Sequence, residues 1–430
     1  MKELIRTINS RILKNVMRAN PIFGKAAQRV ILGCGRILTN ERGVDRLRLR
    51  RKVADAKNIL VIRLDEIGDV ILTIPLLKEI RRLWPTSQVT LITSSKVGPL
   101  MQGQEYVDKV ITYDSQIDSH INVAWRIAKM VLFAVTRLRP GKYELVISPR
   151  WDIDFYGAGP LAFLSGARWR VGYSTKVTSK KQGATNGYDR FYTHLTYDTE
   201  LCHECERTTF ILRALDLKPD VGTLEITHSP DDIRFARQHV CEGRIPEKRL
   251  MVALAPGARQ ARRRWPVDRY GALALWLATN YKAAVVIVGG AEDEAYGEAI
   301  RQIAGSNVIN MAGKADLRRS AAVLTLMDIF VGNDSAPMHM ASAAKLPVVE
   351  ISCHPADGDP HHPNSPARFG PWRVPRSILQ PREAQAPCSG RCASAEPHCI
   401  LGITVEMVEA EVRKLVERKI VGNHNATLEN

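Results

Sequence analysis

The stretch NILVIRLDEIGDV, residues 58–70, decides the fold class of this 430-residue chain. Its first part, Ile59–Ile62, is a short aliphatic run that is typical of a strand buried on both faces. A turn follows at Gly68-Asp69, and an apolar-periodic helix continues to about Leu83. Because a strand, a turn and a helix in this order begin a βαβ unit, we expect an α/β protein.

The same alternation continues along the first half of the chain. Further strands are predicted over residues 89–92, 110–112 and 145–147, with a helix over residues 122–137 before the last of them. Strands separated by helices in this way form a parallel sheet with right-handed crossovers. Residues 58–218 are therefore expected to form one Rossmann-like domain.

The pattern begins again after a connector, residues 219–248, that contains proline and glycine. The strands predicted beyond it cover residues 251–254, 284–288, 307–311, 329–331 and 347–351. Residues 249–400 thus form a second Rossmann-like domain, and residues 401–430 add a C-terminal helix and tail. We expect the two domains to face each other across a cleft, because parallel sheets of this kind bind ligands at the carboxyl ends of their strands.

The net charge of +16 is concentrated at the N-terminus. Residues 1–57 hold 15 of the 61 basic residues and only 4 of the 45 acidic ones. In this extension the apolar residues from Leu4 to Val16 fall on one arc of a predicted helix, and residues 26–38 form a second, patchier apolar stretch. A basic amphipathic helix is typical of a segment that binds an anionic membrane surface. A helix packed on the body of the protein, with its basic face in water, explains the pattern almost equally well.

Composition excludes several classes of protein. With 45% hydrophobic and 25% charged residues, the chain is not wholly disordered, and it has no apolar run of the ~20 residues that span a bilayer. Basic residues interrupt any signal-peptide core, and eight cysteines are too few for a disulfide scaffold, so we predict a cytoplasmic protein. The basic extension has one aromatic residue and no recognisable nucleic-acid module, which disfavours nucleic acid as a partner. The glycine, P-loop, zincin and nucleophile-elbow motifs of common dehydrogenases, NTPases and hydrolases are missing.

Three motifs carry candidate chemistry, and the first is Asp69. Its carboxylate follows the first strand, at the edge of the sheet where ligands bind. Asp69 could act as a general base, or it could merely cap the helix that begins there. The residues themselves leave both alternatives open.

The second and third motifs follow strands of the second predicted domain. Ala258-Arg259 and the run Arg262–Arg264 give a loop with four arginines, which could neutralise a diphosphate or could simply be a solvated basic loop. The stretch GNDSAPMH, residues 332–339, places small residues at a helix N-terminus, where free backbone N–H groups suit a phosphate. His339 lies one turn into this helix and could reach the same anion.

In their order and spacing these motifs resemble those of glycosyltransferase family 9, the heptosyltransferases of lipopolysaccharide synthesis and their relatives. The resemblance extends from about residue 58 to the C-terminus, and His203-Glu204 also looks like a family feature. The matching elements are IGDV (67–70), RRWP (263–266), GGxxDE (289–294), AGK (312–314) and GNDSxPMH (332–339).

The resemblance implies a GT-B fold and a metal-independent, inverting transfer of a sugar from a nucleotide sugar, which is ADP-heptose in the best-known members. The acceptor would be a lipopolysaccharide-type or other lipid-linked cell-surface glycan at the inner face of the bacterial inner membrane, where residues 1–57 would bind. One alternative is another nucleotide sugar, used for capsule, O-antigen or protein glycosylation. The other is a non-catalytic scaffold that binds a sugar nucleotide, which the presence of Asp69 together with Arg263 disfavours.

The resemblance also implies roles for single residues. Asp69 would be the base that deprotonates the acceptor hydroxyl. The donor phosphates would contact Ala258, Arg259, Arg263, Ser335, Ala336 and His339, while Glu294 and Asp334 would contact the nucleoside or the donor sugar. The family usually has Lys at position 263 and Gly at position 336, although an alanine N–H can still donate to a phosphate.

Three cysteines near the C-terminus form a further cluster, namely Cys388, Cys392 and Cys399. Together with Cys353 or His398 they could hold zinc or iron. Three ligands at irregular spacing are not typical of a metal site, so we expect no cofactor and keep a structural metal as the less favoured alternative.

Overall fold

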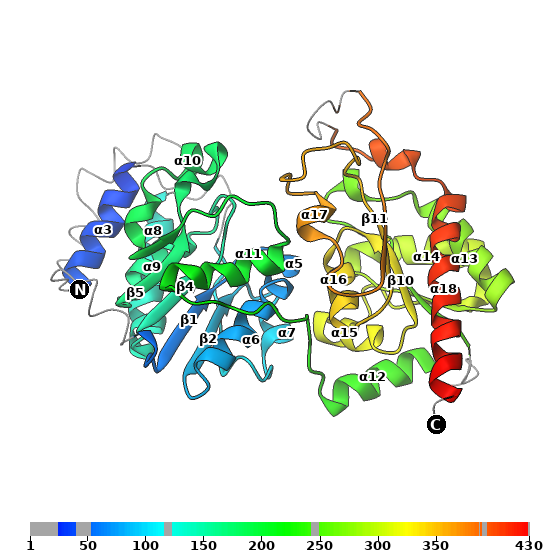
Figure 1. The fold of residues 1–430 in the computed structure, drawn as a ribbon, viewed down its shortest axis with the longest axis horizontal. Coiled ribbons are helices and arrows are strands. Elements are labelled where there is room, and N and C mark those ends of the chain that lie inside the picture. Colours follow the sequence, from blue (N-terminus) through cyan, green and yellow to red (C-terminus); the bar gives the residue numbers. More distant parts are fainter. Residues whose placement is uncertain are drawn as a thin grey trace. The chain divides into compact units, whose positions relative to one another are not determined.

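The structure is a computed structural model, and it describes residues 25–39, 53–115, 123–241, 249–386, 388 and 394–428. The chain forms two compact units (Figure 1). The first unit runs to Gly222 but leaves out Leu201–His203, and the second unit consists of Leu201–His203 and everything from Thr223 onwards. The division therefore falls inside the connector predicted from the sequence, and each unit can be described by itself.

The first unit is built on a six-stranded parallel sheet with the strand order β3-β2-β1-β4-β5-β6. The strands are β1 (Asn58–Ile62), β2 (Gln88–Thr93), β3 (Lys109–Thr112), β4 (Leu145–Ser148), β5 (Trp169–Tyr173) and β6 (His194–Thr196). The chain order reverses direction between β1 and β4, which lie side by side at the centre of the sheet. The carboxyl ends of these two strands are the place where an open parallel sheet binds its ligand.

Helices cover both faces of this sheet. They are α3 (Lys25–Thr39), α5 (Ile67–Ile71), α6 (Ile74–Leu83), α7 (Gly98–Met101), α8 (Val123–Phe133), α9 (Ala158–Leu164), α10 (Ser179–Thr185) and α11 (Glu204–Phe210). α3, α8 and α9 share one apolar core with alternate residues of β1, such as Leu60 and Ile62. The remaining residues of β1 face the opposite side, because side chains alternate along a strand.

α3 shows that part of the basic N-terminal extension belongs to the body of the first unit. Its residues Ala27, Ile31 and Cys34 are fully buried in the core shared with α8 and α9. Gln28 adds a hydrogen bond from its side-chain amide to the carbonyl oxygen of Asn186, at 2.8 Å. Residues 25–39 therefore form a helix packed on the body of the protein, as in the second of the two interpretations of the N-terminal extension. The predicted helix from Leu4 to Val16 lies outside the described residues.

The second unit repeats the plan with a parallel sheet of the order β12-β11-β10-β7-β8-β9. Its strands are β7 (Met251–Ala255), β8 (Ala284–Ile287), β9 (Val308–Asn310), β10 (Ile329–Asn333), β11 (Val348–Ile351) and β12 (Arg376–Leu379). The five strands predicted from the sequence are all present. β12 was not predicted, because it is a half-buried edge strand of four residues within a proline-rich loop region.

Seven helices of the second unit matter for its packing. They are α12 (Pro230–Cys241), α13 (Val267–Tyr281), α14 (Glu294–Ala304), α15 (Leu317–Leu324), α16 (Ala336–Ala343), α17 (Pro366–Phe369) and α18 (Val405–Leu428). α12 packs on α15, and an ion pair of 2.6 Å between Arg318 and Asp232 joins them. The predicted connector therefore contains a helix of the second unit. Among the described helices, none combines the length and the apolar character needed to cross a membrane.

The packing of α3 can be tested by truncating its central core residue. We expect Ile31→Ala to lower the free energy of unfolding by about 2–4 kcal/mol, because it removes a fully buried aliphatic side chain. Urea denaturation measures the change, and Arg29→Ala, on the exposed face of the same helix, is the matched control with an expected change below about 0.5 kcal/mol. Equal stability of both variants would contradict the packed position of α3.

Candidate active site

A buried arginine organises the candidate site of the first unit. Arg63 follows β1 directly, and its side chain is fully buried. Its guanidinium forms three ion pairs, with Asp65 at 2.8 Å, Asp69 at 3.0 Å and Glu204 at 3.2 Å. It also donates a hydrogen bond of 3.1 Å to the carbonyl oxygen of Pro149, just beyond β4. Residues from three separate parts of the chain thus converge on one cation.

Arg150 adds a second cation from the neighbouring strand end. Its Nη1 atom lies 3.2 Å from Asp65 and 3.8 Å from Asp69. Burial raises the pKa of Asp65 to about 6, although Arg150 and Arg63 oppose the rise, so that this carboxylate is still ionised at neutral pH. Two guanidinium groups therefore face three carboxylates, in a cluster that we call the Arg63 cluster (Arg63, Asp65, Asp69, Arg150 and Glu204).

Among the three carboxylates of the Arg63 cluster, Asp69 is the one that reaches solvent. Its side chain is 16% exposed, against 4% for Asp65 and 2% for Glu204. The helix that contains it, α5, has Glu66 at its N-cap, and the Asp69 carboxylate pairs with Arg63 instead of capping the helix. Asp69 is therefore not the N-cap residue of α5, and its role as a general base stays a prediction.

The residues predicted to bind the donor lie at the corresponding edge of the second sheet. Arg263 and Asp334, which follow adjacent strands β7 and β10, form an ion pair of 3.0 Å. Arg263 also donates a short hydrogen bond to the side-chain oxygen of Asn364. The sequence predicts separate ligand contacts for Arg263 and Asp334. The structure brings them together and adds Asn364, which sequence reasoning missed.

Asn333 ties the loops that carry these residues to each other. Its side-chain oxygen accepts a hydrogen bond from the backbone N–H of Trp265 at 3.1 Å, and its amide donates to the carbonyl oxygen of Pro256 at 2.8 Å. Trp265 is fully buried, and its indole N–H donates to the carbonyl oxygen of Ile403 at 2.8 Å. The arginine loop and the start of α16 are thus fixed next to each other.

The other predicted donor residues are placed as follows. Ser335 is the N-cap residue of α16, and its hydroxyl bonds to the carbonyl oxygen of Asn333 at 3.2 Å instead of to the first helical N–H groups. Ala336 opens the helix and is half-buried, whereas His339 and Ala258 are buried. Arg259 and Glu294 are exposed. All of them lie on segments that directly follow β7, β8 or β10, at the carboxyl edge of the sheet.

A buried glutamate beside the Arg263–Asp334 pair was not predicted. Glu350 lies on β11 and is 1% exposed. Burial, together with the negative charge of Asp334, raises the pKa of Glu350 well above its ordinary value, although Arg263 opposes the rise. The charge of Arg263 is matched by its ion pair with Asp334.

His203 and Glu204 are neighbours in sequence but serve different units. The ring of His203 stacks on Trp372 at 4.5 Å, and its Nε2 atom bonds to the carbonyl oxygen of Gly370 at 2.9 Å. Burial lowers the pKa of His203 to about 3, and the positive charges of Arg376 and Arg368 act in the same direction. His203 is thus a neutral donor in the second unit, while Glu204 belongs to the Arg63 cluster of the first unit.

The C-terminal cysteines form a candidate metal site. The ligand atoms of Cys388, His398 and Cys399 all lie within 4.8 Å of one another. A set of two thiolates and an imidazole suits zinc or iron. Of the other predicted ligands, Cys353 contacts the Asn364 amide at 3.8 Å, and Cys392 lies outside the described residues. Because three of the predicted ligands lie together, a structural metal at this site stays a prediction.

Comparisons with known proteins place this fold in one class. Among solved structures, a glycosyltransferase of family 9 from Veillonella parvula has a TM-score of 0.67 at 20% identity, covering 84% of this chain and 97% of that one. The ADP-heptose lipopolysaccharide heptosyltransferase II of Escherichia coli has a TM-score of 0.64 at 19% identity, covering 84% and 99%. The predicted GT-B class of fold, with two Rossmann-like parallel-sheet domains, is confirmed.

The sequence comparisons give the family. The model of glycosyltransferase family 9 (heptosyltransferase) matches residues 161–397, more than half of the chain, so the chain belongs to this family and is a glycosyltransferase. Lipopolysaccharide heptosyltransferase 3 of Escherichia coli K12 is 22% identical over 288 residues, covering 66% of this chain and 79% of the relative. The lipopolysaccharide core heptosyltransferase OpsX of Haemophilus influenzae is 20% identical over 332 residues, covering 77% and 86%.

Removal of the central cation of the Arg63 cluster should lower the stability of the fold strongly. We expect Arg63→Met to lower the free energy of unfolding by about 3–5 kcal/mol, because it removes the buried cation that pairs with the buried carboxylates of Asp65 and Glu204. Arg301→Met is the matched control, since Arg301 pairs with Glu298 at the surface and its loss should change stability by less than about 1 kcal/mol. Urea denaturation compares the two variants, and equal losses would contradict a central role for Arg63.

The lowered pKa of His203 predicts a pH dependence of stability. The unfolded chain takes up a proton near the ordinary histidine pKa of about 6.5 but the folded chain does not, so acid favours the unfolded state. Between about pH 6.5 and pH 4.5 the wild type should lose about 2–3 kcal/mol more than His203→Phe, which keeps a ring on Trp372 but cannot titrate. Denaturation at several pH values measures the difference, and parallel pH profiles would show that His203 is accessible to protons in the folded chain.

Proposed function

We propose that this glycosyltransferase transfers a heptose from ADP-heptose to a lipopolysaccharide-type or other cell-surface glycan, with inversion at the anomeric carbon and without a catalytic metal. The observation that carries the mechanism is the single partly exposed carboxylate of the Arg63 cluster, Asp69. The choice of donor and acceptor rests on relatives named as lipopolysaccharide heptosyltransferases. In this proposal the first unit serves the acceptor and the second unit serves the donor.

Asp69 is the proposed general base. It removes the proton of the acceptor hydroxyl as the hydroxyl oxygen attacks the anomeric carbon of the donor. The new bond joins this carbon to the acceptor oxygen, the bond from the carbon to the phosphate oxygen breaks, and the nucleoside diphosphate leaves from the opposite face. Arg63 and Arg150 keep the carboxylate of Asp69 oriented, since both lie within 4 Å of its Oδ1 atom.

The leaving diphosphate needs positive charge and N–H donors. Arg263 supplies the cation, and its pairing with Asp334 and Asn364 holds the guanidinium in one place. The first turn of α16 supplies backbone N–H groups at Ser335 and Ala336, which the Ser335 side chain does not cap. Preorganised donors of this kind stabilise charge that develops in the transition state. His339 and the Ala258-Arg259 segment would contact the same phosphates, and Glu294 the nucleoside.

The remaining features have supporting roles in the proposal. A metal at Cys388, His398 and Cys399 would hold the chain leading into Ile403, whose carbonyl oxygen accepts the Trp265 indole N–H, and it would take no part in transfer. The positive charge of residues 1–57 would hold the enzyme at the anionic inner face of the inner membrane, where a lipid-linked acceptor is found.

The choice of donor can be tested by thermal stabilisation. ADP-heptose at about 100 times its dissociation constant should stabilise the folded chain by about 2.7 kcal/mol, and UDP- and GDP-sugars at the same concentration should give much smaller shifts. A preference for a UDP- or GDP-sugar would overturn ADP-heptose and favour the alternative of another nucleotide sugar. Failure of every nucleotide sugar to bind would overturn the proposed function.

The role of Asp69 predicts separate effects on binding and on turnover. Asp69→Asn should lower the rate of transfer by roughly 100- to 10,000-fold, because the acceptor hydroxyl loses its base. Its thermal shift with the donor should stay that of the wild type, and the exposed Glu105→Gln in the same unit should keep full activity. Transfer at the wild-type rate by Asp69→Asn would exclude Asp69 as the base.

A further prediction concerns metal in the chemical step. The initial rate of transfer should be the same with and without EDTA in the assay, since cations of the protein replace a metal at the diphosphate. An immediate loss of activity that Mg²⁺ or Mn²⁺ restores would contradict the proposed electrostatics. A slow loss that follows unfolding of the second unit would instead reflect the cysteine–histidine cluster.

A further inference from the structure

Asp65 is a carboxylate of the Arg63 cluster to which the proposed mechanism gives no role. It lies in the segment between β1 and α5, four positions before Asp69, and its side chain is 4% exposed. Both of its oxygen atoms are in ion pairs, Oδ2 with Nε of Arg63 at 2.8 Å and Oδ1 with Nη1 of Arg150 at 3.2 Å. A buried carboxylate with both oxygens paired is not placed to take a proton from an acceptor, so Asp65 is not itself the base.

Asp69 shares both cations with Asp65 but pairs with them through one oxygen atom. Its Oδ1 atom lies 3.0 Å from Nη2 of Arg63 and 3.8 Å from Nη1 of Arg150. Within the part of the chain that the structure describes, no ion pair joins its Oδ2 atom. Because Nη1 of Arg150 lies closer to Asp65, at 3.2 Å, this guanidinium is held mainly by Asp65, and one oxygen of Asp69 is left for a proton.

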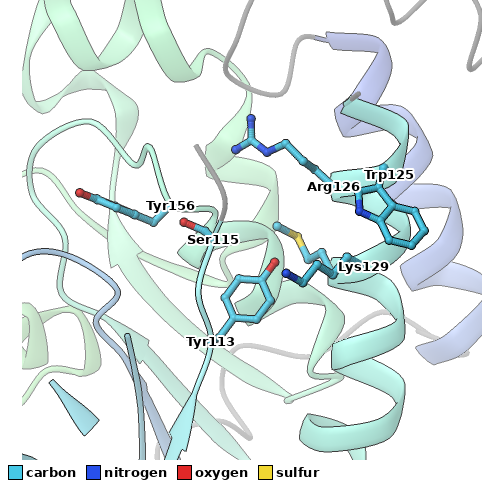
Figure 2. A pocket seen from close by; sticks show the side chains of 7 residues that line it. Tyr113, Ser115, Trp125, Arg126, Lys129 and Tyr156 are labelled. Carbon is cyan, nitrogen blue, oxygen red and sulfur yellow. The ribbon is translucent and has the colours of Figure 1, made fainter. Parts of the chain in front are cut away.

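The other titratable groups that face Asp65 and Arg150 are occupied elsewhere. The carboxylate of Asp154 accepts three backbone N–H groups at the start of α9. Tyr156 lies in the wall of the pocket in Figure 2, its hydroxyl points away from the other labelled side chains, and burial raises its pKa above the ordinary value, so it stays neutral. Lys181 donates to the backbone carbonyl oxygen of Arg150 at 3.1 Å, and burial lowers its pKa to about 8. The two guanidinium groups are therefore balanced by the carboxylates of the Arg63 cluster.

The place of Asp65 in the cluster determines how strongly the two cations act on Asp69. Glu204 forms its ion pair with Arg63, whereas Asp65 pairs with both guanidinium groups. Without the negative charge of Asp65, both cations would act on Asp69 in full. A carboxylate that faces two unshared cations holds a proton less well, and a weaker base makes general base catalysis slower.

We propose that Asp65 is a positioning residue for the transfer reaction, which binds the guanidinium groups of Arg63 and Arg150 and so keeps Asp69 a strong enough base to take the acceptor proton. The proposal rests on the proposed role of Asp69 and adds a second carboxylate to the same site. Asp65 contacts neither donor nor acceptor. Because the two carboxylates share two cations, they titrate as a pair, and the acid limb of the pH profile belongs to both.

The direct test is carbon-13 NMR of the full chain labelled at the side-chain carboxyl carbon of aspartate, in which Asp69→Asn identifies the signal of Asp69. Asp65→Asn should lower the midpoint pH of the Asp69 titration by at least about one unit. Glu204→Gln should lower it by less than half as much, because the ion pair of Glu204 is with one of the two cations. The exposed Glu105→Gln should leave the midpoint unchanged.

A second variant keeps the test valid if Asp65→Asn does not fold. Asp65→Asn combined with Arg150→Met removes one carboxylate and one guanidinium, so the charge balance of the cluster is kept. Its Asp69 midpoint should lie below that of Arg150→Met alone, because Arg63 then acts on Asp69 without sharing its charge with Asp65. Equal midpoints in these two variants would overturn the proposal.

Two further results would also overturn it. An Asp69 midpoint that Asp65→Asn leaves in place, with only a loss of stability, would make Asp65 a purely structural residue. A shift in Glu204→Gln as large as that in Asp65→Asn would show that Asp69 responds to the net charge of the cluster and not to the position of Asp65.

A kinetic measurement separates this proposal from the proposed function. With ADP-heptose as donor and a deacylated lipopolysaccharide core as acceptor, Asp65→Asn should lower kcat at least about threefold and move the acid limb of kcat to lower pH, while KM for the acceptor stays within about twofold. If the wild type transfers no sugar from any nucleotide sugar, the proposed function fails, and the NMR titration still decides the role of Asp65. If the wild type transfers sugar and Asp65→Asn has its kcat and its acid limb, the Asp65 proposal fails alone.

Discussion

The buried guanidinium of Arg63 is the constraint on which the first unit depends. A fully buried cation is tolerated only when carboxylates and carbonyl oxygens surround it, and here they come from the segment after β1, from the end of β4 and from the start of α11. Those three segments cannot move apart without leaving charge unpaired in the interior. The same interaction that holds the unit together therefore orients Asp69, the one carboxylate of the cluster that is partly exposed.

The second unit also holds a paired cation at the carboxyl edge of its sheet, but with fewer charged partners. Its cation, Arg263, is matched by Asp334, and burial raises the pKa of the neighbouring Glu350. Asn333 supplies neutral hydrogen bonds that hold the arginine loop beside α16. These different groups in the two units agree with the proposed transferase mechanism. In that mechanism one unit orients a base, and the other offers cations and N–H groups to a diphosphate.

The sequence predicts the parts of this protein that depend on local pattern. Aliphatic runs such as Ile59–Ile62 identify most strands, and the motifs around Asp69 and Arg263 predict which loops form the candidate site. Contacts between distant residues could not be predicted, because Arg63 and Glu204 are 141 positions apart and nothing local pairs them. The half-buried edge strand β12 and the raised pKa of Glu350 were missed for a similar reason, since each depends on burial that only the folded chain creates.

The account makes a single carboxylate responsible for a direct displacement at the anomeric carbon. The most direct test is the anomeric configuration of the first product formed from donor and acceptor, read from the anomeric proton coupling or the one-bond carbon–proton coupling in its NMR spectrum. One displacement with Asp69 as base predicts a configuration opposite to that of the donor. Retention of the donor configuration would contradict the proposed mechanism, because a single displacement from the face opposite the diphosphate inverts the anomeric carbon.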